Sequence, residues 1–398
     1  MPHQNTHHWP YSLPIALLLM APFDLLASLA MDIYLPIVPS MPAILATSPD
    51  MVQLTLSLYL AVLGIGQVIF GPLSDRIGRL PVLLGGGLVF AIASFLLALT
   101  SSAPVFVTVR VVQGLGAAAM LVATFATVRD VYARRPEGAV IYSLFGSMLA
   151  FVPALGPIAG ALIAEHLGWR AIFALLGSLA LAATLHALSR WPETRPAMRS
   201  GSRGMFGAIL TDRAFWTYTT GFGTAMGAFF VFFSTAPYVL VERAGLSQLA
   251  FSLLFATVAL VMIATARFTA NLVGRWGIPG SLRRGMALLM TGSALLSAGQ
   301  MIGGISPWTF IPPMWIVAIG IVLSVSVTAN GALARFAEVA GTATALYFCV
   351  QSLMVGIIGT SFVILLPVDS AWPIIGYCTS MAIVTLALLA ATSRTATI

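Results

Sequence analysis

Two nine-residue stretches, GPLSDRIGR (71–79) and RFTANLVGR (267–275), indicate how this 398-residue chain is organised. They align without a gap at an offset of 196 residues, which pairs Gly78 with Gly274 and Arg79 with Arg275. Each stretch follows a long apolar run. So short a match carries little weight alone, but its placement predicts two related halves, as in transporters that alternate access between repeats.

The runs around these stretches are too apolar for a soluble domain. The chain is 59% hydrophobic and only 8% charged, whereas soluble proteins carry about 25% charged residues. Windows of about 20 apolar residues suit membrane-spanning helices. They predict an all-α integral membrane protein with twelve transmembrane helices, at 12–37, 50–72, 80–100, 103–127, 138–164, 169–189, 213–240, 248–271, 281–304, 308–332, 340–366 and 371–391.

A polar stretch, RWPETRPAMRSGSRGMFG (190–207), separates these helices into two groups of six. We therefore expect an N-terminal six-helix bundle at 1–189, a central loop at 190–212 and a C-terminal six-helix bundle at 213–398.

Arginine placement predicts the orientation in the membrane. All nineteen basic residues are arginine, and fifteen lie in the segments on one side, against two on the other, Arg170 and Arg243. The positive-inside rule then places both termini and the central loop in the cytoplasm. Because the charge is spread over short loops, we expect no nucleic-acid binding. Cys349 and Cys378 lie in apolar runs, which excludes a disulfide framework.

Two carboxylates interrupt the first apolar run, at Asp24 and Asp32 of APFDLLASLAMDIYLP (21–36). A charged residue at mid-membrane costs about 2.5–3.5 kcal/mol on insertion scales, so such residues are usually functional. An eight-residue gap is about 12 Å along a helix and about 80° around it, so both can border one cavity. Carboxyl groups removed from water can exchange protons near neutral pH. The alternative is that the two carboxylates only snorkel toward the membrane surface or form hydrogen bonds with neighbouring helices.

Arg110, in FVTVRVVQGLGAAAM (106–120), is a second kind of intramembrane charge. An arginine in such a place needs an anionic or carbonyl partner. We predict an ion pair with Asp32 at similar depth, or contact with Asp24 through a shared polar cavity, and a further hydrogen bond from Gln113. The alternative is an arginine bonded to backbone carbonyls, without a role in transport.

GPLSDRIGR also predicts a cytoplasmic gate. Gly71 and Pro72 should break the helix, Asp75 can cap or face a helix N-terminus, and Arg129 is a candidate partner for Asp75. A loop that only sets topology would explain the arginines, but not the glycines and the aspartate. The predicted gate comprises Gly71, Asp75, Arg76, Gly78, Arg79 and Arg129.

The stretch SLFGSMLAFVPALGPIAGALI (143–163) combines small residues with prolines. Small residues allow close helix packing and proline bends a helix, so we predict a bending interface between the halves, with ordinary close packing as the alternative. Its residues are Gly146, Pro153, Gly156, Pro157 and Gly160.

Enzyme motifs are missing from the sequence. HExxH, Walker A and GxSxG do not occur, so we expect no enzyme, no metal site and no cofactor. Uphill transport would then use an ion gradient. A membrane-embedded enzyme is a disfavoured alternative.

Several motifs resemble those of the drug:proton antiporters of the major facilitator superfamily: GPLSDRIGR, RVVQGLGAA, GPIAG and PET (192–194). Three longer stretches resemble the bacterial phenicol exporters, which pump out chloramphenicol and florfenicol: MAPFDLLASLAMDIYLPIVP (20–39), VATFATVRDVYARRPEG (122–138) and FVFFSTAP (230–237). One departure is Leu80, where the motif after Gly78 usually continues with a second basic residue.

The resemblance implies an inner-membrane exporter that exchanges a drug for protons. It assigns Asp24, Asp32 and Arg110 to proton coupling and drug recognition, and the GPLSDRIGR residues to the gate. Phenicols are neutral and amphipathic, so we expect hydrogen bonds and aromatic walls. The candidate walls, each of which can equally be a packing residue, are Tyr34, Tyr59, Phe229, Phe230 and Tyr347.

The expected partners are therefore a small-molecule drug, protons and the lipid bilayer, and we expect a monomer. Two other functions stay open. One is a multidrug exporter of lipophilic cations, and the other is a proton-coupled metabolite transporter.

Overall fold

The computed structural model describes residues 9, 11–132, 136–195, 206–302, 304, 306–336 and 340–395. In this part of the chain the regular structure is entirely helical. In chain order the elements are α1 (Leu13–Asp32), η1 (Leu35–Ser40), α2 (Met41–Ile44), α3 (Pro49–Ile77), α4 (Arg79–Leu99), α5 (Ala103–Tyr132), α6 (Pro136–Leu167), α7 (Trp169–Arg190), α8 (Phe206–Thr211), α9 (Arg213–Pro237), η2 (Tyr238–Arg243), α10 (Gln248–Ile302), α11 (Pro307–Leu333), α12 (Ala340–Met354), η4 (Val355–Gly359), α13 (Thr360–Leu365) and α14 (Trp372–Thr395).

The twelve predicted membrane helices are confirmed. Among the described residues, ten helical segments are long and apolar enough to span a bilayer. One of them, α10, has 55 residues and turns at Gly277, whose φ of 67° is not helical, so it supplies two spans. α6 supplies the remaining span, through its apolar part Phe151–Leu167.

Three spans contain an irregular turn. The first continues from α1 into the 3₁₀-helix η1, whose LPIVPS sequence places two prolines within six residues. The spans that begin with α9 and α12 contain the π-helical turns η2 and η4. Such turns in membrane helices are frequent at functional sites.

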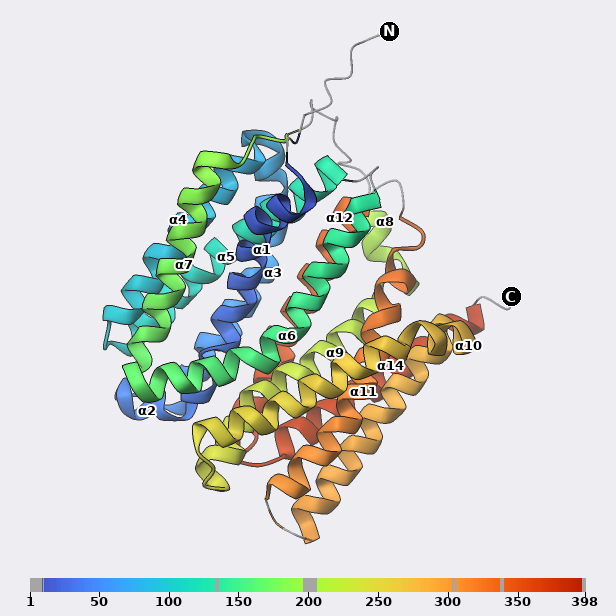
Figure 1. The fold of residues 1–398 in the computed structure, drawn as a ribbon. Coiled ribbons are helices and arrows are strands. Elements are labelled where there is room, and N and C mark those ends of the chain that lie inside the picture. Colours follow the sequence, from blue (N-terminus) through green and yellow to red (C-terminus); the bar gives the residue numbers. More distant parts are fainter. Residues whose placement is uncertain are drawn as a thin grey trace.

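The helices form two groups. α1 and α3–α7 pack mainly against one another, as do α9–α14, and Figure 1 shows the groups side by side in blue to green and yellow to red. Between the groups, α3 contacts α12 and η4, and α6 contacts α10. The two groups therefore meet along a shared interface.

Each group has two ends. The turns at Gly78, Gly277 and Arg335 lie at the end where α1 begins and α14 ends, which we call the terminal face. The turns after α2, α4 and α6 lie at the opposite face. Three hydrogen bonds join described residues of the two groups, and all three lie in the half of the spans nearer the opposite face.

The internal repeat diverges in structure. The first copy ends its helix at Gly78, whose φ is +114°, whereas α10 continues through Gly274 and Arg275 and turns only at Gly277. Arg79 is buried, while Arg275 is exposed. The two copies therefore align in sequence but differ in the position of the turn and in the surroundings of its arginine.

Candidate functional site

Arg110 lies on α5 and is fully buried within the N-terminal group. Its Nη1 donates to Gln113 Oε1 at 2.6 Å, three residues along the same helix, and to the Ala30 carbonyl of α1 at 3.2 Å. Gln113 in turn donates to Ser94 Oγ of α4 at 2.7 Å. A short hydrogen-bonded chain therefore joins α1, α5 and α4 through the guanidinium.

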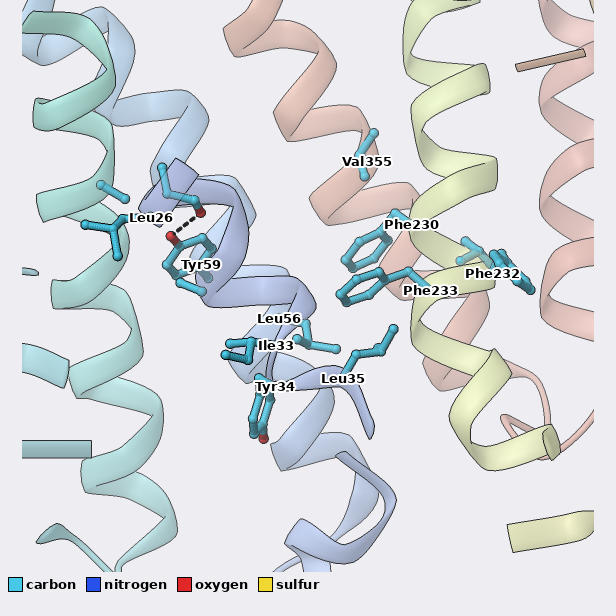
Figure 2. Close-up of a cluster of buried hydrophobic side chains, with 14 of the residues drawn as sticks. Leu26, Ile33, Tyr34, Leu35, Leu56, Tyr59, Phe230, Phe232, Phe233 and Val355 are labelled. Atoms are coloured by element: carbon cyan, nitrogen blue, oxygen red, sulfur yellow. Dashed lines mark hydrogen bonds between the residues drawn. The ribbon is translucent and has the colours of Figure 1, made fainter. Parts of the chain in front are cut away.

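Two tyrosine rings flank this guanidinium. Its Cζ lies 4.6 Å from the ring centroid of Tyr59 and 5.3 Å from that of Tyr34. Tyr59 is held by its hydroxyl, which donates to the Ala27 carbonyl at 2.7 Å, the dashed line in Figure 2. A cation over an aromatic face gains about 2 kcal/mol when it is desolvated. The charge of Arg110 is thus stabilised by rings and carbonyls.

The predicted ion pair between Arg110 and Asp32 is wrong for this conformation. Within the described part of the chain, no carboxylate lies within 4.0 Å of the guanidinium. Two residues along a helix amount to about 200° of rotation, so Asp32 projects away from the side on which Ala30 meets Arg110. Asp32 instead faces α6, where a Cβ on Gly156 would lie 2.8 Å from the Asp32 Cβ.

Asp24 and Asp32 are nevertheless both buried in α1, with 0% and 6% of their surfaces exposed. Among the described residues, neither oxygen of the Asp24 carboxyl has a hydrogen-bond partner, and Asp32 Oδ1 has none. An ionised carboxylate left in that state costs several kcal/mol. The arrangement therefore suits carboxyl groups that carry their protons.

The predicted aromatic residues lie in two places. Tyr34 and Tyr59 surround Arg110, whereas Phe229, Phe230 and Tyr347 belong to the C-terminal group. Figure 2 shows Phe230 on α9 directed toward the N-terminal group. Tyr347 stacks on Phe222 at 4.7 Å and donates to Thr328 Oγ1, so it is tied into the packing of its own group.

At the terminal face, Arg79 forms the centre of the predicted gate. This buried side chain donates to Asp75 Oδ1 at 2.5 Å, to Asp130 Oδ2 at 2.8 Å and to Ser74 Oγ at 2.9 Å. Asp130 was not predicted, although it follows Arg129 directly in the sequence. The predicted pair of Arg129 with Asp75 is wrong, because Asp75 is bound by Arg79 and Arg129 Nε lies 3.6 Å from Asp130 instead.

The gate turn also lies later than predicted. α3 continues through Gly71 and Pro72 to Ile77, and the chain turns at Gly78. Proline has a helical φ and costs one hydrogen bond, which membrane helices tolerate. The φ of +114° at Gly78 is one that only glycine adopts readily.

Glu193 caps the helix that begins at this turn, a role predicted for Asp75. Its carboxylate accepts the backbone N–H groups of Arg79 at 2.8 Å and Leu80 at 3.1 Å. A carboxylate at a helix N-terminus satisfies free donors and the helix dipole. Arg195 donates to the carbonyl of Arg76, so the start of the central segment is fastened to the turn. The Arg76 side chain is exposed.

The small residues of α6 contact both groups. A side chain on Gly160 would collide with the backbone of Ile33, directly after α1, and the Pro157 carbonyl accepts a hydrogen bond from Ser252 of α10 at 3.1 Å. Pro153 lies within the same helix. Gly146 is also in α6, where its surroundings lie outside the described side chains.

Polar residues that were not predicted join the two groups near the opposite face. Gln53 Nε2 of α3 donates to Ser234 Oγ of α9 at 3.0 Å, and Thr360 Oγ1 of α13 donates to Ser57 Oγ of α3 at 2.5 Å. All four are buried. Scattered serine, threonine and glutamine residues carry no sequence signal, so only the packing of distant helices reveals them.

Comparison with known proteins gives a consistent result. The sequence profile of the Major Facilitator Superfamily matches residues 23–360. The chain is 53% identical over 382 residues to a chloramphenicol resistance protein of Pseudomonas aeruginosa, covering 96% of this chain and 91% of that protein. It is 31% identical to the uncharacterized MFS-type transporter YdgK of Bacillus subtilis (82% and 83% covered) and 27% identical to multidrug resistance protein D of Escherichia coli (86% and 87% covered).

Proposed function

Because the chain belongs to the Major Facilitator Superfamily, we propose that it is an exporter of phenicol antibiotics, chloramphenicol above all, driven by the proton gradient. The observation that carries the proposal is the 53% identity, over nearly the whole chain, to a chloramphenicol resistance protein. The protein would act by alternating access between its two six-helix groups, without a cofactor. We place it in the bacterial inner membrane as a monomer, with both termini in the cytoplasm.

The site around Arg110 supports a neutral, amphipathic substrate. The guanidinium has two nitrogens, Nε and Nη2, without a hydrogen-bond partner among the described residues. Tyr34 and Tyr59 lie against it, and Phe230 of α9 is directed toward the N-terminal group. Free donors beside aromatic rings suit a molecule with hydroxyl, amide and aryl groups. A lipophilic cation would be repelled by the arginine.

Proton exchange is assigned to Asp24, assisted by Asp32. Both carboxyl groups are buried, and among the described residues both oxygens of Asp24 and Oδ1 of Asp32 have no hydrogen-bond partner. Ionisation of these groups therefore depends on a conformational change that brings water or a donor to them. Protonation from outside would accompany drug release, and proton loss to the cytoplasm would restore drug binding. Exchange of a neutral drug for one proton moves charge, so voltage would add about 2.3 kcal/mol per 100 mV.

The test is accumulation of labelled chloramphenicol in cells that express the chain, with and without a protonophore. We expect low accumulation that rises when the gradient is collapsed. The Asp24→Asn variant should accumulate drug as cells without the protein do, because an amide cannot exchange a proton in this range. Full export by that variant would remove Asp24 from coupling, and export insensitive to the protonophore would overturn proton drive.

A second candidate is a multidrug exporter, which the similarity to multidrug resistance protein D favours. A susceptibility panel with chloramphenicol, florfenicol, a cationic dye and a quinolone separates the two functions. Resistance to the dye without resistance to either phenicol would select the second candidate.

A further inference from the structure

The turn inside α10 carries positive charge that the described part of the chain does not balance. We define the basic turn as Arg275, Trp276, Arg283 and Arg284, on either side of Gly277. All three arginines are exposed. Arg284 Cζ stacks 4.6 Å from the Trp276 ring, and none of the three arginines has a described carboxylate within 4.0 Å. The turn lies at the outer edge of the molecule (Figure 1).

The equivalent turn of the other half is neutralised. There, Arg79 is paired with Asp75 and Asp130. In the second copy of the repeat, Asn271 stands where the first has Asp75. The sequence has no acidic residue at all between Glu242 and Glu338. The second copy therefore has no acidic residue at its turn, although it has an arginine at the position of Arg79 and two more at Arg283 and Arg284.

Arg283 and Arg284 follow the turn closely. α10 resumes after Gly277, and both arginines fall within the first two turns of the resumed helix. Arg284 Nη1 donates to the carbonyl of Gly280 at 3.2 Å. The N-terminal end of a helix has a partial positive charge, so the backbone supplies no anionic counterpart for these two guanidinium groups.

We propose that the basic turn binds the headgroup of an anionic phospholipid. It lies where two membrane spans end, the level at which lipid phosphates lie and tryptophan is enriched. Guanidinium groups match a phosphate with paired hydrogen bonds, and Trp276 holds one of them in place. Each arginine near an anionic headgroup strengthens binding about five-fold. The proposal does not depend on which drug the protein carries.

The experiment uses the purified full-length chain in detergent and counts bound lipid by native mass spectrometry during titration with phosphatidylglycerol or phosphatidylcholine. The wild-type chain should retain phosphatidylglycerol in preference to phosphatidylcholine. The double variant Arg283→Gln and Arg284→Gln should bind phosphatidylglycerol about 25-fold more weakly, five-fold for each arginine. The matched control is Arg190→Gln with Arg213→Gln, which removes two exposed charges from the same face and should leave binding unchanged.

Three outcomes would overturn the proposal. The first is equal loss of phosphatidylglycerol in the test and control variants, which would reflect net charge alone. The second is equal retention of both lipids by the wild-type chain. The third concerns the source of the phosphate: if inorganic phosphate raises the melting temperature of the wild-type chain as much as phosphatidylglycerol does, and the double variant loses both effects, the ligand is a free anion.

Discussion

At the scale of single residues, the arrangement around Arg110 depends on shape as well as charge. Guanidinium is planar and can stack between two rings while it donates within its plane, whereas ammonium is a compact point charge. The Arg110 guanidinium lies over the rings of Tyr34 and Tyr59 and donates a hydrogen bond to the Ala30 carbonyl. The position therefore requires arginine even though no carboxylate of the described residues contacts it.

We predict that Arg110→Lys lowers the rate of chloramphenicol transport at least ten-fold while the protein still inserts and folds. The lysine keeps the charge but loses the stacking and the paired donors. Uptake into inverted vesicles is the measurement, with Arg170→Lys as the control, because Arg170 also stacks on an aromatic ring, Trp169, but is exposed. If the Arg110→Lys variant transports chloramphenicol at the wild-type rate, only the positive charge at this position is required.

The residue scale also shows the limit of sequence reasoning. The burial of Asp24, Asp32 and Arg110 could be predicted, because a charge inside an apolar run has few explanations. The partner of Arg110 could not be predicted, because an equal depth of two residues in the membrane does not tell how each helix is rotated about its axis. The side of α1 that carries Ala30 faces Arg110, and the side that carries Asp32 faces α6.

At the scale of elements, the twelve spans follow from the apolar runs, and their ends were predicted within a few residues. The apolar runs do not show where the backbone inside a span bends or departs from helical geometry. Pro72 lies within a continuous helix, while Gly78 ends it, because only the glycine adopts a non-helical φ. Glu193, which caps α4, comes from more than a hundred residues away, so no local pattern pairs the two.

We predict that Gly78→Ala destabilises the protein by about 1–3 kcal/mol, the usual cost of a strained backbone position. The added Cβ would also collide with the carboxylate of Glu193 that caps α4. Thermal unfolding in detergent is the measurement. Gly71→Ala is the matched control, since Gly71 is helical and its Cβ would meet no atom within 4 Å. Equal melting temperatures for the two variants would contradict this account of the turn.

At the scale of the whole molecule, the two faces are held by different chemistry. The terminal face has a charged cluster around Arg79 that lies within one group. Near the opposite face, neutral hydrogen bonds join the groups, through Gln53 to Ser234 and Thr360 to Ser57. These bonds must break if the opposite face opens, so they help to set the population of the open conformation.

We predict that Gln53→Leu raises the population of molecules open at the opposite face about five-fold, because one lost hydrogen bond is worth about 1 kcal/mol. Spin labels at Ser102 and Ser247, one in each group and both exposed at that face, would report a larger share of long distances in double electron–electron resonance. Gln67→Leu, on the same helix and only partly buried, should leave the distribution as in the wild-type chain. If Gln53→Leu also leaves it unchanged, the close packing of the two groups, as at Gly64 against Ser352 and Gly356 against Ala61, holds them together, and this hydrogen bond is incidental.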